Sequence, residues 1–595
     1  MSDIRVPVLV VGGGGAGLTA SMLLSTLGVE SLLVNSLPTT SVLPKAHILN
    51  QRAMEIMQDT GVSDAIYAVG TPPEQFAYTA VYAGFSGHEN AGRRLAKIEC
   101  WGNGGRDLDW VAASPLLSTN LPQIRLEPIL RERAEQLAPG RVRFHHELVS
   151  FEQDADGVTA TIADLDNGTE YTVRADYMVA CDGGRTVGRI MGVEMQGLRR
   201  LASQVSIHMS TDFSQLAVDD DVLIRWHFVP EIGAMVVMVP MGPGKWGTES
   251  PEWVVHLNYP ADDPRSFEDG KVEQDLRAAL GIGDHPITIH KISNWAAEGI
   301  IADRFTEGRV FLCGDAAHKH PPTGGLGLTS GMHDVQNLTW KIAAVLNGHA
   351  GADLLSTYEP ERRSSIEKNV RRSLENSKQW SVTGRVLRVN DPDLTAEQKW
   401  EHLSRAWSGK PEDADIAKEI GEALAVHSME FHEQNIEYGY TYESAAVVPD
   451  GSEPLPNPDP VRVYVMSTRP GHPLPHAWVE RGQGGDRMST VNLVKPGRFL
   501  LIAGEEGHDW CAAAAQVSTE LGVPVDAVRI GHASGDLLDP RMSWTRLREH
   551  GPRGAILVRP DRFVAWRSHD EVNEPLGLLR SVLNQVLHQI GRAHV

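Results

Sequence analysis

Cysteine is scarce in this sequence of 595 residues, which contains only Cys100, Cys181, Cys313 and Cys511. No two of these cysteines form a CxxC pair, which excludes a disulfide framework and a clustered-cysteine zinc or iron–sulfur site. His318 and His320 lack a third ligand nearby in the sequence, so we expect no metal centre. A chain that depends so little on disulfides is expected in the reducing cytoplasm.

Long apolar runs and an excess of positive charge are also missing. Residues 8–11 are too short for a secretory signal, and no apolar run approaches the ~18 residues that a membrane helix needs. The 77 acidic residues exceed the 55 Lys and Arg residues, giving a net charge of −22. Such a surface repels phosphate backbones and anionic lipids. We therefore expect neither nucleic acid nor membrane as a partner, which leaves a small-molecule substrate open.

The N-terminus begins with a pattern typical of dinucleotide binding. A β-branched strand at residues 6–11 runs directly into Gly12, Gly14 and Gly17, and a helix and a second strand at 31–34 follow. The first glycine permits a tight turn, the second lets a pyrophosphate approach the backbone, and the third allows close packing of helix on strand. A plain glycine-rich turn is the alternative interpretation.

The residue that ends the second strand departs from the usual pattern. An acidic residue normally binds the ribose hydroxyls there, whereas this sequence has Asn35. An amide both donates and accepts hydrogen bonds, so it can still bind a hydroxyl. This departure argues against NAD at this site but is compatible with FAD.

Two further turns follow buried strands later in the chain. Asp182, Gly183, Thr186 and Arg189 come after the strand 177–180, and Gly314-Asp315 comes after the strand that ends at Cys313. Each turn alone is common, but the three motifs in this order are specific. Together they resemble the single-component FAD-dependent aromatic hydroxylases, which share the fold of p-hydroxybenzoate hydroxylase.

The resemblance is closer to the phenol-type branch of that family, which includes 2,4-dichlorophenol 6-monooxygenase and 2-hydroxybiphenyl 3-monooxygenase. It spans nearly the whole chain, through residues 44–55, 121–123, 127–128, 313–327 and 557–561. It implies non-covalent FAD, with NADPH or NADH as a transient co-substrate. The implied cofactor contacts are Gly12, Gly14, Gly15, Gly17, Asn35, Lys45, Gln123, Asp182, Gly183, Arg189, Gly314, Asp315, Pro322, Gly325, Leu326, Gly327 and Leu328.

The resemblance also implies a substrate pocket, formed by His47, Trp226, Val239 and Pro321. His47 is the candidate catalytic residue, because an imidazole with an ordinary pKa of about 6.5 can accept a phenolic proton near neutral pH. A loop histidine that only caps backbone is the alternative for His47, and core packing is the alternative for Trp226.

The implied reaction adds one oxygen atom of O₂ to a phenolic or hydroxy-heteroaromatic ring, ortho to its hydroxyl, through a C4a-hydroperoxyflavin. Tailoring of an aromatic natural product, such as a polyketide phenol or a hydroxypyridine, is a second possibility. A flavin-binding redox protein without hydroxylation is an alternative of another class. Its support is that Lys45 replaces an arginine of the family and Asn120 an aspartate. These departures leave the substrate open.

The predicted fold is α/β: a p-hydroxybenzoate hydroxylase-like FAD-binding fold with a β-sheet substrate domain and a C-terminal thioredoxin-like domain. The predicted division is FAD binding at 1–185, with strands of the substrate domain near 75–120, then the substrate domain at 186–295 and FAD binding again at 296–400. A connector at 401–464 and the C-terminal domain at 465–595 follow. Because Cys511 has no partner cysteine at the first strand–helix junction, we expect that last domain to be redox-silent. We also expect a homo-oligomer.

Overall fold

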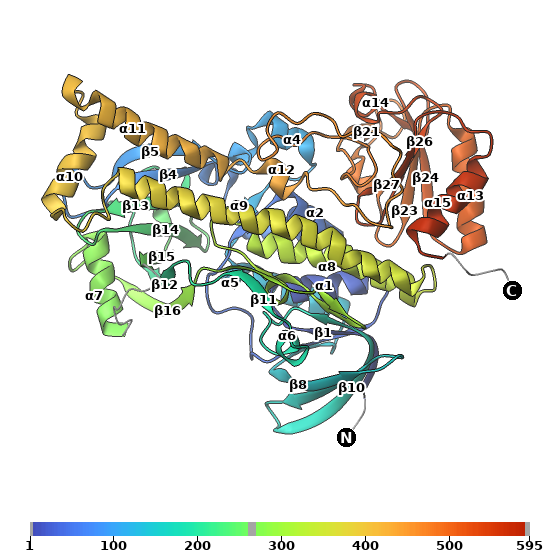
Figure 1. Cartoon of the computed structure of the whole chain (residues 1–595), viewed down its shortest axis with the longest axis horizontal. Coiled ribbons are helices and arrows are strands. Elements are labelled where there is room, and N and C mark those ends of the chain that lie inside the picture. The colour runs from blue at the N-terminus through green and yellow to red at the C-terminus, as the bar shows by residue number, and fades with distance from the viewer. Residues whose placement is uncertain (1–3, 260–268, 590–595) are drawn as a thin grey trace.

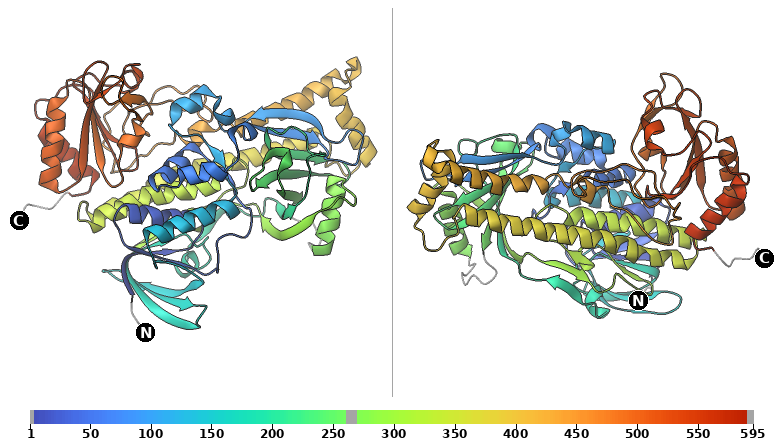
Figure 2. Two further views of the ribbon diagram at one scale, coloured as in Figure 1. Left: turned by 180° about the vertical axis from the view of Figure 1, so that it is seen from behind. Right: turned by 45° about the horizontal axis from the view of Figure 1, so that its top comes forward.

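The computed structural model describes residues 4–259 and 269–589. Three β-structures lie along the molecule (Figures 1 and 2): a seven-stranded sheet that includes β13 (Val222–Val229) and β14 (Ala234–Gly242) at one end, a central eight-stranded sheet, and the C-terminal sheet at the other end. The long helices α8 (Gly327–Leu346) and α9 (Tyr358–Val386) run along the middle.

The central sheet is parallel through its buried core. β1 (Ile4–Val11) pairs in parallel with β2 (Ser31–Asn35) and β10 (Thr169–Ala180), and β10 pairs in parallel with β19 (Val310–Leu312). The remaining strands are β7 (Val142–Phe144), β8 (His146–Gln153), β9 (Val158–Asp164) and β18 (Thr306–Glu307). The predicted strands at 6–11 and 31–34 are therefore present.

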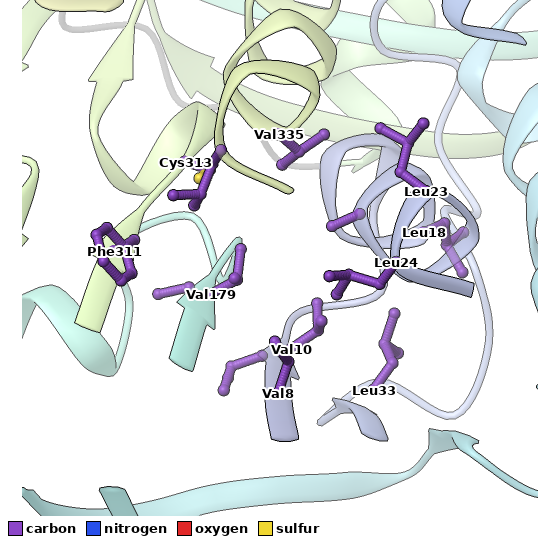
Figure 3. Close-up of a cluster of buried hydrophobic side chains, with 14 of the residues drawn as sticks. Val8, Val10, Leu18, Leu23, Leu24, Leu33, Val179, Phe311, Cys313 and Val335 are labelled. Atoms are coloured by element: carbon purple, nitrogen blue, oxygen red, sulfur yellow. The ribbon is translucent and has the colours of Figure 1, made fainter. Parts of the chain in front are cut away.

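Apolar side chains of the strands pack against helices, because a parallel sheet is buried on both faces. Figure 3 shows Val10, Val179 and Phe311 of the strands facing α8 and α1 (Gly15–Thr26), with Leu24 reaching down from α1. The helices α2 (Gln51–Asp59), α3 (Ser63–Val69), α5 (Gln123–Leu137) and α6 (Val187–Ile190) complete this part of the molecule.

Two glycines of the first loop are required by close contacts. Gly12 has φ +109°, and a Cβ there would lie 2.3 Å from the carbonyl oxygen of Cys181. A Cβ on Gly17 would lie 1.9 Å from the carbonyl oxygen of Gly12. Any larger residue at either position would push the loop away from the carboxyl edge of the sheet.

The seven-stranded sheet has the strand order β16-β12-β15-β14-β13-β4-β5. Its strands are β4 (Tyr78–Ala83), β5 (Arg93–Glu99), β12 (Ser203–Ser210), β13 (Val222–Val229), β14 (Ala234–Gly242), β15 (Glu252–Tyr259) and β16 (Thr288–Ala296). One face packs on α7 (Asp269–Leu280) through Val236, Met238 and Leu276. The other face carries Trp226 and Val237 toward α9.

Smaller elements connect these layers. A three-stranded sheet is formed by β11 (Met195–Leu198), β17 (Gly299–Ala302) and β20 (His318–Lys319), and β3 (Ile48–Leu49) pairs with β6 (Thr119–Asn120). The segment that we predicted as a connector contains α11 (Ala414–Ala425) and α12 (Gln434–Glu437), and α10 (Ala396–Ser404) lies just before them. Trp400, Leu403 and Leu424 pack on the seven-stranded sheet, so this segment covers the sheet as well as connecting it.

The C-terminal sheet has the order β22-β21-β25-β24-β23-β26-β27. The strands are β21 (Trp478–Glu480), β22 (Arg487–Ser489), β23 (Phe499–Ala503), β24 (Val525–Gly531), β25 (Leu537–Leu538), β26 (Ala555–Val558) and β27 (Val564–Ser568). The parallel pair β23–β24 is joined by α13 (His508–Leu521), which packs with α15 (Pro575–Val586) in one apolar cluster.

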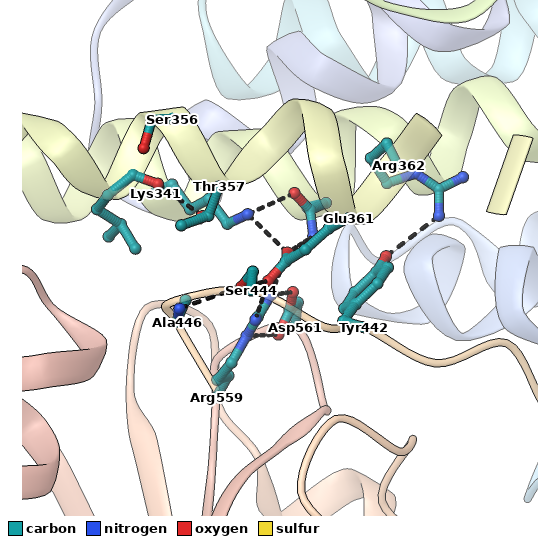
Figure 4. Close-up of polar contacts among 12 residues, drawn as sticks. Lys341, Ser356, Thr357, Glu361, Arg362, Tyr442, Ser444, Ala446, Arg559 and Asp561 are labelled. Carbon is teal, nitrogen blue, oxygen red and sulfur yellow. Dashed lines mark hydrogen bonds and ion pairs between the residues drawn. The ribbon is translucent and has the colours of Figure 1, made fainter. Parts of the chain in front are cut away.

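A buried ionic network fixes this sheet to the long helices (Figure 4). Arg559 donates to both carboxylate oxygens of Glu361 on α9, at 2.6 and 2.9 Å, and to Asp561. Lys341 on α8 and Ser444 donate to the same Glu361 carboxylate, at 2.7 and 2.6 Å. Since breaking a buried pair leaves an uncompensated charge, this network favours a fixed position for the C-terminal sheet.

Within the described residues, helices long and apolar enough to cross a membrane are absent. The same part of the chain contains no group of three or more His, Cys, Asp or Glu side chains arranged to hold a metal ion.

Candidate active site

One large cavity lies where the central sheet meets the seven-stranded sheet. Its volume is about 1630 Å³, more than the ~300–1,000 Å³ usual for a pocket that holds one small ligand. The loops after β1, β2, β10 and β19 line one end, and strands β12 to β15 line the other. The cavity therefore has room for a large cofactor beside a substrate.

The glycine loop forms the first end of the cavity. Gly14 precedes α1, and none of the described side chains caps this helix. The first N–H groups of α1 therefore remain available, with the positive end of the helix dipole, for a pyrophosphate. Asn35 closes the loop: its side chain accepts from Gly13 N at 3.0 Å and donates to Leu37 O at 3.1 Å.

Asp182 holds the second motif in shape. Its carboxylate accepts from the backbone N–H groups of Gly184, Thr186 and Val187, at 3.0, 2.7 and 2.9 Å. Asp182 and Gly183 line the cavity, whereas Arg189 lies exposed on α6 and does not line it. Arg185, which the sequence analysis did not select, lines it instead.

The third motif and the loop after it form the middle of the cavity. Asp315 exposes its carboxylate there, in a position suited to the hydroxyls of a sugar-like chain. His320 has both ring nitrogens buried without a hydrogen-bond partner among the described residues. The helix α8 begins at Gly327 without a side-chain cap or an acidic residue in its first turn. Unused donors, an open carboxylate and a free helix N-terminus fit a bound flavin dinucleotide.

Most of the predicted cofactor residues do meet in this cavity. Only Gly17, which packs behind the loop, and Arg189 lie outside its lining. Those that line it are Gly12, Gly14, Gly15, Asn35, Lys45, Gln123, Asp182, Gly183, Gly314, Asp315, Pro322, Gly325, Leu326, Gly327 and Leu328, together with the four predicted pocket residues His47, Trp226, Val239 and Pro321.

His47 is held in one orientation by its neighbours. Its Nδ1 lies 2.6 Å from Asn120 Oδ1, and Asn120 Nδ2 donates to Thr71 Oγ1 at 2.7 Å. Because the Asn120 amide already donates through nitrogen, its oxygen accepts, and the ring proton of His47 must sit on Nδ1. Burial lowers the pKa of His47 to about 4. The imidazole is therefore neutral near pH 7, with Nε2 as a proton acceptor.

An aromatic stack forms one wall of the cavity. Trp226 stacks on Trp380 of α9 with centroids 4.1 Å apart, and Trp380 stacks on His427 at 3.6 Å. Trp226 Nε1 donates to Thr79 Oγ1 at 2.8 Å. Trp226 thus both packs in the core and lines the cavity, and its contact with a substrate ring stays a prediction.

Three further residues of the cavity were not selected from the sequence. Glu127 accepts from Ser41 N at 2.7 Å and its side chain lies beside Gly14. Glu430 accepts from Gly324 N at 3.1 Å, and His256 faces the cavity from β15. Glu127 belonged to a segment that carried the family resemblance, which could have identified it. Nothing local marks Glu430 or His256, because their positions depend on packing and on strand register.

The fold and this cavity define a flavin-dependent enzyme. Comparison with known proteins supports this: residues 5–373 match the FAD binding domain family, and residues 467–589 match "Aromatic-ring hydroxylase, C-terminal". The chain belongs to the FAD-dependent aromatic-ring hydroxylases. The prediction of FAD and of a flavin-dependent monooxygenase is thus confirmed.

The relatives are monooxygenases and hydroxylases named for different substrates. The chain is 33% identical to 2,4-dichlorophenol 6-monooxygenase of Delftia acidovorans, covering 98% of both chains. It is 33% identical to aklavinone 12-hydroxylase RdmE of Streptomyces purpurascens, covering 99% of this chain and 100% of that one. A solved structure of the flavin-dependent monooxygenase PieE, in complex with FAD and substrate, superposes with TM-score 0.91 at 37% identity, covering 99% of this chain and 100% of that one.

Proposed function

We propose that this enzyme hydroxylates a phenolic or hydroxy-heteroaromatic ring ortho to its hydroxyl, with His47 accepting the hydroxyl proton. The observation that carries the proposal is the state of His47 at the cavity wall. Its Nδ1–H is engaged by Asn120, and its Nε2 is left as an acceptor on the cavity side. A ring that loses its hydroxyl proton gains electron density at the ortho carbon, which makes that carbon a better nucleophile.

The chain's own residues position the ring and exclude water. Trp226 and Phe431 offer aromatic surface, and Val237 and Val239 offer apolar surface, all lining the cavity. Bound FAD would supply activated oxygen after reduction by NAD(P)H, as is typical of the family. The donors around the glycine loop, Asp315 and the start of α8 would hold it. We propose NADPH or NADH as the reductant, a homo-oligomeric state and the cytoplasm as the location.

Natural-product tailoring is the second candidate function. Two observations favour it: the cavity is large, and the structural similarity to PieE is high over the full chain. A hydroxypyridine or a polyketide phenol would then be the substrate, in place of a simple catabolic phenol.

The experiment is a panel of simple phenols, hydroxypyridines and polyketide phenols, read by product mass. Consumption of NAD(P)H alone is insufficient, since uncoupled turnover consumes it too. We expect at least one ring to gain one oxygen atom ortho to a hydroxyl. His47→Ala should keep FAD and lose product formation by about 10²–10⁴-fold, the usual contribution of general acid–base catalysis. A drop of only twofold, or an FAD-loaded wild type that hydroxylates no ring, would refute the proposal.

A further inference from the structure

We propose that His256 is a second substrate-binding residue, which donates a hydrogen bond to an acceptor atom on the ring that His47 activates. The inference rests on the proposed function and names a narrower substrate class: rings that carry both a hydroxyl and a hydrogen-bond acceptor, such as a ring nitrogen, a carbonyl or an alkoxy oxygen.

The strand register places His256 in one row with the aromatic wall. His256 of β15 lies opposite Ser206 on β12 and opposite Val237 on β14, and Val237 lies opposite Trp226 on β13. Ser206, His256, Val237 and Trp226 all line the cavity. Because neighbouring strands lie about 4.8 Å apart, His256 and Trp226 stand roughly 10 Å apart, with Val237 between them. That span suits a substituted aromatic ring.

The polar half of the sheet continues around His256. Gln204, Ser206 and Asn258 line the cavity from the same strands, and Trp295 of β16 lines it nearby. Toward β13 and β14 the lining is apolar, through Ile224 and Val237. The cavity therefore has a polar side and an apolar side on one continuous sheet, so a ligand that is apolar throughout would leave the polar side unmatched.

The hydrogen bonds of Ser206 determine the tautomer of His256. Trp295 Nε1, which can only donate, lies 2.9 Å from Ser206 Oγ, and His256 Nδ1 lies 2.7 Å from the same oxygen. Among the described partners of Ser206, His256 Nδ1 is the one that can accept the hydroxyl proton. Ser206 therefore donates to Nδ1, and the ring proton of His256 sits on Nε2 as a donor.

The Nε2 atom of His256 is open to the cavity. It has no hydrogen-bond partner within the described residues, and it is not one of their buried unpartnered atoms. Burial, together with a smaller effect of the charge that His47 carries when protonated, lowers the pKa of His256 to about 4. The two rings are thus close enough to interact. Both are neutral near pH 7 and complementary: Nε2 of His47 accepts, and Nε2–H of His256 donates.

The test uses matched phenols that differ in one acceptor atom: methoxyphenols against ethylphenols, substituted at the ortho, meta or para position. Their dissociation constants for the oxidised, FAD-loaded enzyme are measured from the flavin absorbance, and hydroxylated products by mass. We expect at least one methoxyphenol to bind about three- to tenfold more tightly than its ethyl partner, as one neutral hydrogen bond allows.

Variants assign that preference to His256. His256→Phe should reduce the methoxy-to-ethyl ratio to about one, and His256→Gln, whose amide still donates, should restore part of it. Ser206→Ala removes the hydroxyl that fixes the tautomer of His256. It should therefore lower the methoxy-to-ethyl ratio, and the enzyme should still bind FAD. His290→Asn is the control, because His290 lies on β16 of the same sheet but does not line the cavity.

The outcomes separate this inference from the proposed function. The role of His256 is overturned, while hydroxylation stands, if the wild type binds the methoxyphenol and the ethylphenol of every pair equally. It is also overturned if the methoxy-to-ethyl ratio is unchanged in both His256→Phe and Ser206→Ala. If the wild type hydroxylates no member of any pair and no other ring, the proposed function fails and the inference fails with it.

Discussion

At the scale of single residues, the charge state of His47 depends on the amide of Asn120. An aspartate at that position would place a carboxylate about 2.6 Å from the imidazole. A neighbouring opposite charge favours the protonated ring. Asn120 instead supplies a hydrogen bond without a charge, and burial keeps the pKa of His47 near 4. The proton acceptor is thus available over a wide pH range.

Asn120→Asp should therefore move the acid limit of hydroxylation. In the wild type, Nε2 of His47 becomes protonated, and stops accepting a proton, only as pH falls toward about 4. In the variant the pKa of His47 rises, so the ring is already protonated at higher pH and coupled product formation falls from the acid side. The measurement is product per NAD(P)H against pH from 5 to 9. Asn584→Asp on α15 adds the same charge far from the cavity and should leave the profile unchanged. An identical profile in Asn120→Asp would contradict this account.

At the scale of elements, Glu430 joins the loop 321–327 to the aromatic wall. Its carboxylate accepts from Gly324 N at 3.1 Å and from Trp380 Nε1 at 2.7 Å, and Trp380 stacks on Trp226. Glu430 is buried, and all four residues line the cavity. One carboxylate thus fixes the cofactor loop relative to the surface on which a substrate ring would lie.

Glu430→Gln should uncouple the enzyme while FAD stays bound. A glutamine has the same shape, but its single carbonyl accepts while its NH₂ group opposes the second N–H donor. We expect product per NAD(P)H to fall at least about twofold, with hydrogen peroxide making up the difference. Trp380→Phe, which removes one donor but keeps a ring, should show part of the effect. Glu367→Gln, exposed on α9, is the control. Full coupling in Glu430→Gln would show that the bridge is dispensable.

The sequence predicts the cofactor end of the cavity better than the substrate end, because the cofactor motifs are local and the substrate residues meet only through strand pairing. The glycine loop, Asp182 and Asp315 each sit in a short turn directly after a buried strand, so a local pattern identifies them. The substrate end depends on pairing at a distance: Ser206 and His256 are fifty residues apart and meet only through the register of β12 and β15. Arg189 shows the limit of motif transfer, because one turn of α6 directs it to the surface while Arg185 reaches the cavity.

At the scale of the whole molecule, the C-terminal sheet lies apart from the chemistry. Of the residues that the structure describes, none beyond Phe431 lines the cavity. Its contacts with the rest include the buried network of Arg559, Glu361 and Asp561 and the ion pair of Arg562 with Asp59. Its one cysteine, Cys511, lies half-buried on α13, and burial raises the pKa of its thiol to about 11. Near pH 7 this thiol is protonated and is a poor nucleophile.

Cys511→Ser should therefore leave catalysis intact: flavin reduction by NAD(P)H, product per NAD(P)H and FAD content should match the wild type. Arg559→Met is the contrasting variant, because it removes the guanidinium that pairs with two buried carboxylates: among the described residues Glu361 keeps only Lys341 as an ion-pair partner, and Asp561 loses its ion pair with Arg559. It should lower the free energy of unfolding by about 3–5 kcal/mol and lower the melting temperature, since the sheet would lose its anchor on α9. Stopped-flow reduction and thermal unfolding measure the two effects. A Cys511→Ser enzyme that binds FAD normally but is no longer reduced by NAD(P)H would make this domain a redox partner of the flavin.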